Sequence, residues 1–163
     1  MRYGEIRQYD VANGPGIRTV IFVTGCTHNC KNCFNGEYQD FNYGEIWTEN
    51  ETLKAIKYLN DENVSGLTLL GGEPMQNLEL IEIVKKIKSE VLKPIWVYSG
   101  YTFDEIISNE KRCELLALCD VLVDGRFVEE QKDLKLKFRG SRNQRIIDIK
   151  KSLEARKVEL YDI

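Results

Sequence analysis

The sequence predicts an α/β fold, a partial and open (βα) barrel whose strands run parallel, and three observations support this prediction. Apolar, β-branched runs alternate with amphipathic segments between residues 17 and 148, which is typical of βαβ units around a parallel sheet. The chain has 163 residues, fewer than the roughly 250 of a closed eightfold barrel. The clearest strands each exit into a glycine, at Gly25, Gly71, Gly100 and Gly125. Because ligands gather at the carboxyl ends of parallel strands, we expect these four loops to form one rim.

The first expected strand covers residues 17–23, which follow the turn-rich stretch 9–16 and are apolar on both faces from Val20 on. Such a run belongs in the interior of a parallel sheet. Thr48 and Glu51 then form a capping-box pattern, and Leu53, Ile56 and Leu59 recur on one face. This pattern predicts a helix over about 48–59 that returns to the sheet.

The remaining elements follow the same alternation of strand and helix. A second capping-box pattern, Thr102 with Glu105, opens the last helical region, which breaks near Asn109. The expected elements are a strand at 67–70, a helix over 78–91, a strand at 95–98, helices between 102 and 118, a strand at 120–124, a weak strand at 145–148 and then a polar tail.

Composition limits the classes of protein to which the chain can belong. With 42% hydrophobic and 30% charged residues, it resembles a soluble globular protein, and we expect a single domain over residues 1–163. No export signal and no run of membrane-spanning length is present, so we expect a cytoplasmic location and no membrane partner. Five cysteines without an export signal favour reduced thiols and metal ligation over disulfides.

The net charge of −3 is unevenly distributed. Residues 132–157 hold ten Lys or Arg and three Asp or Glu, a balance of +7 that leaves −10 for the rest. This segment is either a solvated basic face or a docking surface for an acidic protein, such as a flavodoxin-type electron donor or a larger partner enzyme. Nucleic-acid binding is a weaker alternative, because aromatic residues do not interleave with these charges in a recognisable RNA-binding pattern, and no DNA partner is expected.

Three cysteines, Cys26, Cys30 and Cys33, lie four and three residues apart in a polar loop directly after the first strand. Iron–sulfur clusters are normally held by four thiolates, and structural zinc also takes four ligands. Three thiolates on one small object therefore leave one metal position open for a substrate or cofactor. Two alternatives remain: a zinc site completed by His28, the single histidine, and cysteines that merely pack in the core.

The spacing Cys26-x3-Cys30-x2-Cys33, together with Gly71-Gly72-Glu73-Pro74 some forty residues later, resembles the radical S-adenosylmethionine (SAM) superfamily. The resemblance implies a partial barrel of the radical SAM type and a [4Fe-4S] cluster with three cysteine ligands. SAM would chelate the open iron, and one electron from the cluster would release a 5′-deoxyadenosyl radical. The glycine motif would bind the methionine amino group of SAM through its main chain.

The same resemblance assigns further cofactor-binding residues. Tyr98, Ser99 and the strand end at Asp124 would face the ribose, the carboxylate or a monovalent cation, although ordinary strand ends explain them equally well. Many superfamily members carry an aromatic residue just before the third cysteine, where this chain has Asn32. Adenine contacts are therefore expected from Asn32, Cys33 and Phe34.

Several stretches resemble one family within that superfamily, the activating proteins of anaerobic ribonucleoside-triphosphate reductases. They are Asn13-Gly14-Pro15-Gly16-Ile17-Arg18, Asp124-Gly125-Arg126-Phe127 and Arg139-Gly140-Ser141-x-Asn143-Gln144. The resemblance implies an oxygen-sensitive oxidoreductase that acts through the cluster on Cys26, Cys30 and Cys33. Its partners would be the large glycyl-radical subunit of the reductase and a flavodoxin- or ferredoxin-type electron donor.

Less specific features leave other interpretations open. Arg139, Arg142 and Arg145 are either docking residues or ordinary surface arginines, and Cys113 and Cys119 match no ligand spacing and are expected to pack. A pyruvate formate-lyase activase, a small radical SAM enzyme acting on a metabolite, and a binding module that is zinc-stabilised or carries electrons are the alternative functions.

Overall fold

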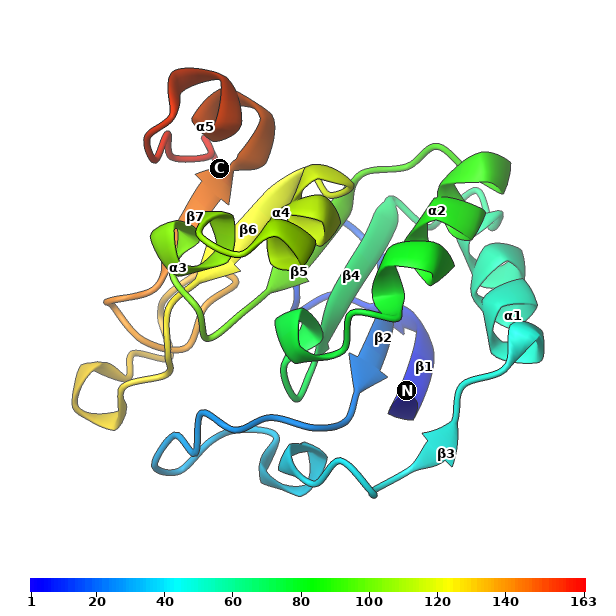
Figure 1. Cartoon of the computed structure of the whole chain (residues 1–163), viewed down its shortest axis with the longest axis horizontal. Coiled ribbons are helices and arrows are strands. Elements are labelled where there is room, and N and C mark those ends of the chain that lie inside the picture. Colours follow the sequence, from blue (N-terminus) through cyan, green and yellow to red (C-terminus); the bar gives the residue numbers. More distant parts are fainter.

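The computed structural model describes all of residues 1–163, and an open seven-stranded sheet lies at its centre (Figure 1). The strand order is β3-β1-β2-β4-β5-β6-β7, so the two ends of the sheet do not meet. The strands are β1 (Arg2–Asp10), β2 (Arg18–Val23), β3 (Glu45–Ile46), β4 (Gly66–Gly71), β5 (Ile95–Tyr98), β6 (Val121–Asp124) and β7 (Arg145–Asp148). This architecture confirms the predicted open α/β fold.

Five α-helices and three short 3-10 helices connect the strands. The α-helices are α1 (Glu49–Leu59), α2 (Leu80–Glu90), α3 (Phe103–Ile107), α4 (Glu110–Ala117) and α5 (Ile149–Ala155), and the 3-10 helices are η1 (Gly36–Gln39), η2 (Pro74–Gln76) and η3 (Glu129–Gln131). The longest helices have eleven residues. None of the helices combines the length and the apolar character needed to cross a membrane.

The centre of the sheet is parallel and its flanks are antiparallel. β2, β4, β5 and β6 run in the same direction, with Val20 opposite Thr68 and Trp96 opposite Val121. β1 pairs antiparallel with β2, β3 with β1, and β7 with β6. The sequence analysis did not predict β1 or β3. β1 is largely polar and mostly half-buried, so it contains no apolar run to recognise, and β3 consists of only two exposed residues.

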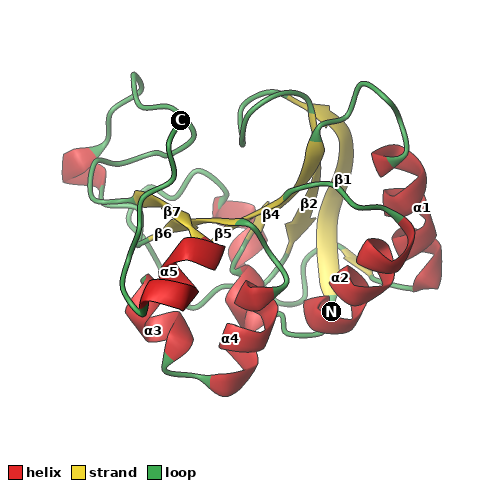
Figure 2. Ribbon diagram, turned by 90° about the horizontal axis from the view of Figure 1, so that it is seen from above, coloured by secondary structure: helices red, strands yellow, loops and turns green.

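Side chains alternate between two differently covered faces of the sheet. Ile95 and Val97 of β5 join a core cluster of 25 buried residues that lies between the sheet and the helices. Trp96, between them, belongs to a small second cluster on the inner face. Figure 2 shows the five helices on the outer side of the curved sheet, while loops face its inner side. This alternation follows from the two-residue period of a strand.

The helical predictions are confirmed in their positions and wrong in some details. The break near Asn109 separates α3 from α4, and Thr102 with Glu105 forms a complete capping box. Thr48 caps α1 through the backbone N–H of Asn50 and not of Glu51, so the reciprocal box is not formed there.

Two predictions about helical segments are wrong. Leu53 is 51% exposed, and α1 buries Thr52 and Ala55 beside Ile56 and Leu59. The face of α1 that packs toward the sheet is therefore smaller and less apolar than the predicted face of Leu53, Ile56 and Leu59. The predicted polar tail contains α5, which Asp148 caps by accepting a hydrogen bond from the backbone N–H of Lys151.

Arg18 closes the inner space at the amino ends of the parallel strands. Its side chain is buried, lies over the Trp96 ring, and donates from Nε to Thr68 Oγ1 (2.9 Å) and from Nη2 to the carbonyls of Leu67 (2.9 Å) and Pro94 (3.0 Å). Gly14 makes room for it, since a Cβ there would lie 2.6 Å from Arg18 Cδ. Burial lowers the pKa of Arg18 to about 10, so it stays charged at neutral pH. Gly14 and Arg18 of the Asn13–Arg18 motif thus have a structural role.

Replacing Arg18 with Met should lower the free energy of unfolding by about 2–3 kcal/mol, because buried carbonyls lose a charged donor. Urea denaturation measures this. Arg142→Met is the matched control, since its exposed guanidinium makes no hydrogen bond or ion pair, and it should change stability by about 0.5 kcal/mol or less. Equal effects in the two variants would contradict the assigned role of Arg18.

Candidate functional site

A cavity of about 430 Å³ opens at the carboxyl ends of the parallel strands. Cys26 follows β2, Gly72 and Glu73 follow β4, Ser99 and Gly100 follow β5, and Gly125 follows β6; all of them line it. The volume falls within the range of about 300–1,000 Å³ that is usual for small-molecule and cofactor sites. The four loops therefore share one rim, in agreement with the prediction.

The three closely spaced cysteines all line this cavity, and their thiols are free. Burial raises the pKa of Cys26 to about 11, against a smaller opposite effect of the His28 backbone N–H, and burial also raises the pKa of Cys30. Both are thus thiols at neutral pH until a metal displaces the proton. The cavity brings together three thiols and no fourth cysteine.

The other two cysteines lie away from the cavity. Cys119 is buried in the main core, where burial raises its pKa to about 12, and Cys113 is half-buried on α4. Neither lines the cavity. Cys119 thus packs in the core as expected, whereas Cys113 is only partly covered.

The two glycines of the motif allow the loop after β4 to approach the start of the cysteine loop. Gly71 has φ +112°, and a Cβ on Gly72 would lie 2.5 Å from the Tyr38 carbonyl oxygen. The backbone N–H of Glu73 donates to the Gly25 carbonyl over 2.8 Å. Of the predicted motif, Gly72 and Glu73 line the cavity, whereas Gly71 and the buried Pro74 lie behind it.

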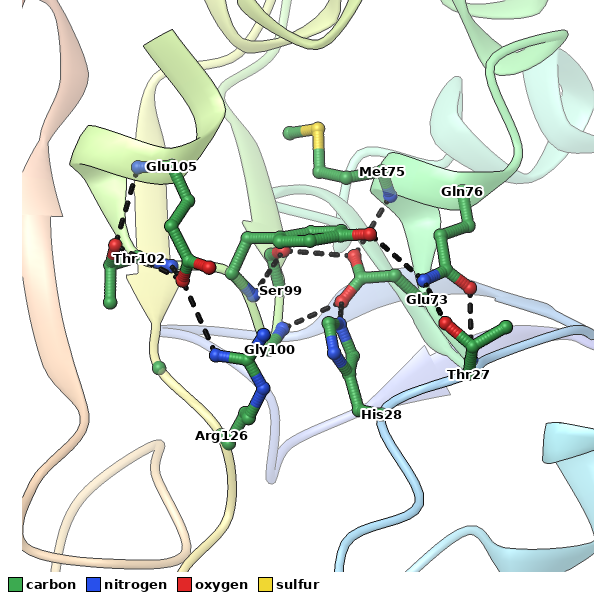
Figure 3. A network of polar contacts seen from close by, with 12 residues as sticks. Thr27, His28, Glu73, Met75, Gln76, Ser99, Gly100, Thr102, Glu105 and Arg126 are labelled. Carbon is green, nitrogen blue, oxygen red and sulfur yellow. Dashed lines mark hydrogen bonds and ion pairs between the residues drawn. The ribbon is translucent and has the colours of Figure 1, made fainter. Parts of the chain in front are cut away.

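Glu73 is 1% exposed, and its carboxylate is surrounded by hydrogen-bond donors (Figure 3). Oε1 lies 2.6 Å from His28 Nε2 and accepts from the Gly100 backbone N–H at 2.7 Å. Oε2 accepts from Ser99 Oγ and from the Met75 backbone N–H, each at 2.9 Å. The side chains of Glu73 and Ser99 therefore bind each other and the loops, which leaves the main chain of this region for contact with a ligand.

Asp124 also binds within the protein. It is 1% exposed and accepts from Arg145 Nε (3.0 Å), Arg145 Nη2 (2.6 Å) and the Phe103 backbone N–H (2.8 Å). The hydrogen bonds to Asp124 raise the pKa of Arg145. Asp124 does not line the cavity, although its neighbours Val123 and Gly125 do. Its predicted contact with a cofactor or cation remains a prediction, and its carboxylate is already paired.

The aromatic candidate Phe34 lines the cavity, whereas Asn32 is exposed, has φ +54° and does not. The Phe34 ring packs on Phe127, with 4.9 Å between ring centroids, and the Lys132 ammonium lies 5.3 Å from its centre. Tyr98 lines the cavity as well, donates from its hydroxyl to the Phe138 carbonyl at 2.6 Å, and has its pKa raised by burial. Of the predicted adenine contacts, Cys33 and Phe34 thus face the cavity.

Most of the lining that the sequence analysis missed comes from the segment after β6. Its lining residues are Phe127, Asp133, Leu134, Leu136, Phe138, Arg139, Gly140 and Gln144. This segment overlaps the basic stretch 132–157, for which the sequence analysis considered charge and a family resemblance but predicted no contribution to the cavity. The alternating apolar positions at 134, 136 and 138 were the signal that could have revealed it. Arg7 of β1 also lines the cavity and was missed together with its strand.

The expected docking arginines differ in what they contact. Arg139 donates to the Gln144 carbonyl and Arg145 pairs with Asp124, so both hold the chain itself. Arg142 is exposed and its side chain makes no such bond. Of the three, Arg142 is the one whose guanidinium makes no hydrogen bond or ion pair within the chain.

The chemistry of the donor set distinguishes a cluster from a single metal ion. No group of three or more Cys, His, Asp or Glu side chains is arranged to hold a metal ion, whereas a zinc site needs four ligand atoms about 2.0–2.3 Å from the ion. His28, the fourth ligand of the zinc alternative, is bound to Glu73. Three thiols that face one cavity fit a cluster, in which each cysteine binds a different iron.

Comparison with known proteins supports the same centre. A family model described as a 4Fe-4S single cluster domain matches residues 12–147. Anaerobic ribonucleoside-triphosphate reductase-activating proteins of Vibrio cholerae serotype O1 and Escherichia coli K12 are 40% and 39% identical to this chain over 150 residues, which cover 88% of it and 96% of each relative. The protein of the same name from Enterobacteria phage T4 is 39% identical over 90% of the chain and 93% of its own length. The chain thus contains a 4Fe-4S cluster domain.

Gly100→Ala tests the packing of this rim. A Cβ at residue 100 would lie 2.5 Å from His28 Cδ2 and 2.8 Å from His28 Nε2, so the ring or the loop must shift, which strains the contact between His28 and Glu73. We expect a loss of about 1–3 kcal/mol in the free energy of unfolding, the usual cost of overpacking, measured by urea denaturation. Gly36→Ala is the control, because a Cβ there meets nothing within 4 Å. Full stability of the Gly100 variant would contradict this geometry.

Proposed function

The chain belongs to the family of anaerobic ribonucleoside-triphosphate reductase-activating proteins, and from this we propose that it installs a glycyl radical on the large subunit of an anaerobic ribonucleotide reductase. The observation that carries the proposal is the cavity itself. Its rim presents three thiols and no fourth cysteine, as a centre with one open metal position requires.

In this proposal Cys26, Cys30 and Cys33 hold a [4Fe-4S] cluster, and S-adenosylmethionine occupies the remaining space. When bound, these cofactors supply a one-electron cleavage of the sulfonium whose 5′-deoxyadenosyl radical takes the Cα hydrogen of a glycine in the reductase. The hard chemistry belongs to the cofactors, and this chain positions them and shields the reaction from water.

The cavity lining supports a role for particular residues in holding S-adenosylmethionine. The main chain at Gly72 and Glu73 faces the cavity beside the cysteine loop, where the methionine end would bind. The Phe34 ring and the Cys33 main chain are suited to contact adenine. A monovalent cation near Asp124 would have to share a carboxylate that Arg145 already binds.

The surface around the basic segment 132–157 supports docking of a negatively charged partner. Lys135, Lys137 and Arg142 are exposed there, and Leu134, which lines the cavity, is 83% exposed. Opposite charges steer association and fix orientation. In this proposal the surface receives the reductase subunit at the open mouth of the cavity, and a flavodoxin- or ferredoxin-type protein delivers the electron.

Replacing Cys26, Cys30 or Cys33 with Ala should lower the iron content after anaerobic reconstitution from about four atoms per chain to less than one, since a cluster with two protein ligands is not retained. Iron and sulfide analysis measures this. Cys113→Ser is the control and should keep its iron, because Cys113 lies outside the cavity. Iron loss in the control alone would refute the assigned ligands.

A partner swap tests the substrate. The reduced, reconstituted protein with S-adenosylmethionine should give a glycyl EPR doublet on the large subunit of an anaerobic reductase, with about one 5′-deoxyadenosine per radical, and no doublet on pyruvate formate-lyase. A doublet on pyruvate formate-lyase alone would identify the chain as an activase of that enzyme. Modification of a small metabolite with no protein partner present would equally overturn the proposed substrate.

A further inference from the structure

The cysteine loop, residues 26–34, has almost no hydrogen bonding of its own. Within it the only bond between backbone groups joins the Cys33 N–H to the Cys30 carbonyl at 3.3 Å. Asn29 and Asn32 both have φ +54°, a left-handed backbone conformation that asparagine adopts more often than other residues with a Cβ and that is typical of irregular loops. A loop of this kind has no secondary structure to hold it, so contacts from outside must fix its conformation.

Gln76, at the end of η2, supplies one such contact. Its Oε1 accepts from the Thr27 backbone N–H at 3.0 Å, and its Nε2 donates to Thr27 Oγ1 at 2.7 Å. One planar amide thus binds both the main chain and the side chain of the residue between Cys26 and His28 (Figure 3). The residue lies outside the glycine motif that the sequence analysis singled out.

His28 supplies the second contact. Its Nε2 lies 2.6 Å from Glu73 Oε1, with the two side chains 5% and 1% exposed. Its ring meets the Tyr101 ring edge-on, 4.6 Å between centroids. Tyr101 is held from behind by Arg112, whose Nη2 donates to the Tyr101 hydroxyl at 2.8 Å, and Gln76 Nε2 donates to the same hydroxyl at 2.9 Å. The two contacts are therefore parts of one network.

We propose that Gln76 and His28 are positioning residues that lock the cysteine loop in register with the loop after β4. Gln76 binds Thr27, and His28 binds Glu73. In each pair one residue belongs to the cysteine loop, between Cys26 and Cys30, and the other belongs to the loop after β4, on either side of Pro74 and Met75. The network thus ties the loop that carries the thiols to the loop proposed to bind the methionine end of the cofactor. The part of this inference that concerns the cofactor rests on the proposed function, and the part that concerns loop order does not.

Hydrogen exchange on the full-length, metal-free chain tests loop order directly. In Gln76→Met, which keeps the volume and removes the amide, the Thr27 amide should exchange about tenfold faster, because its acceptor is gone. Amides of β4 and α2 should be unchanged. Gln39→Met is the matched control, because the Gln39 side chain makes no hydrogen bond although its carbonyl accepts from Cys26. Unchanged exchange at Thr27, or equal acceleration throughout the chain, overturns the proposal.

A conservative variant and the loaded protein provide further readouts. Gln76→Glu keeps an acceptor for the Thr27 N–H and should restore its protection. After reconstitution, Gln76→Met and His28→Leu should release iron to a chelator severalfold faster than wild type and show a weaker change in the cluster EPR signal on addition of S-adenosylmethionine. Wild-type release rates and spectra in both variants overturn the positioning role. If the EPR spectrum of the wild-type protein does not change on addition of S-adenosylmethionine, the proposed function is wrong. The hydrogen-exchange rate of the Thr27 amide still tests the contact between Gln76 and the cysteine loop.

Discussion

The buried carboxylate of Glu73 is the interaction on which the site depends. A carboxylate that is removed from water must be bound by donors, because an unpaired buried charge is very costly. Its donors come from the cysteine loop, from η2 and from the loop after β5. The hydrogen bonds to this one buried carboxylate thus hold together the cysteine loop, the loop after β4 and the loop after β5. This arrangement also fixes the positions of the thiols.

Close approach of the main chain is the second requirement, and glycines at the rim permit it. At Gly72 and Gly100 the space that a Cβ would take is already filled, by the Tyr38 carbonyl in one case and by the His28 ring in the other. The glycine motif therefore has a packing role that does not depend on any ligand. A ligand would meet the same exposed main chain, which explains how one motif can serve both purposes.

The fold divides its polar groups between support and chemistry. Arg18 at the amino ends of the strands and the Asp124–Arg145 pair at the carboxyl end of β6 are hydrogen-bonded within the chain. The cysteine thiols face the cavity without disulfide partners. An activating protein of a reductase needs this division, because the supporting groups stay paired while the site remains open to cofactors and to a protein substrate. The segment after β6, with its apolar lining and exposed lysines, borders the cavity and would meet the partner in the proposed complex.

The sequence by itself determined the parallel core, the helices between its strands and the cysteine motif, because local period and spacing encode these features. It did not reveal β1, whose polar residues form a strand only between β2 and β3, or the burial of Thr52 in place of Leu53. Tertiary structure also decided the partners of Glu73 and Asp124. The sequence shows that the two carboxylates are present. Apart from the Met75 N–H next to Glu73, however, their donors lie 21 to 45 residues away in the chain. Only the packed chain brings them within hydrogen-bond distance, and local patterns carry no information about such pairs.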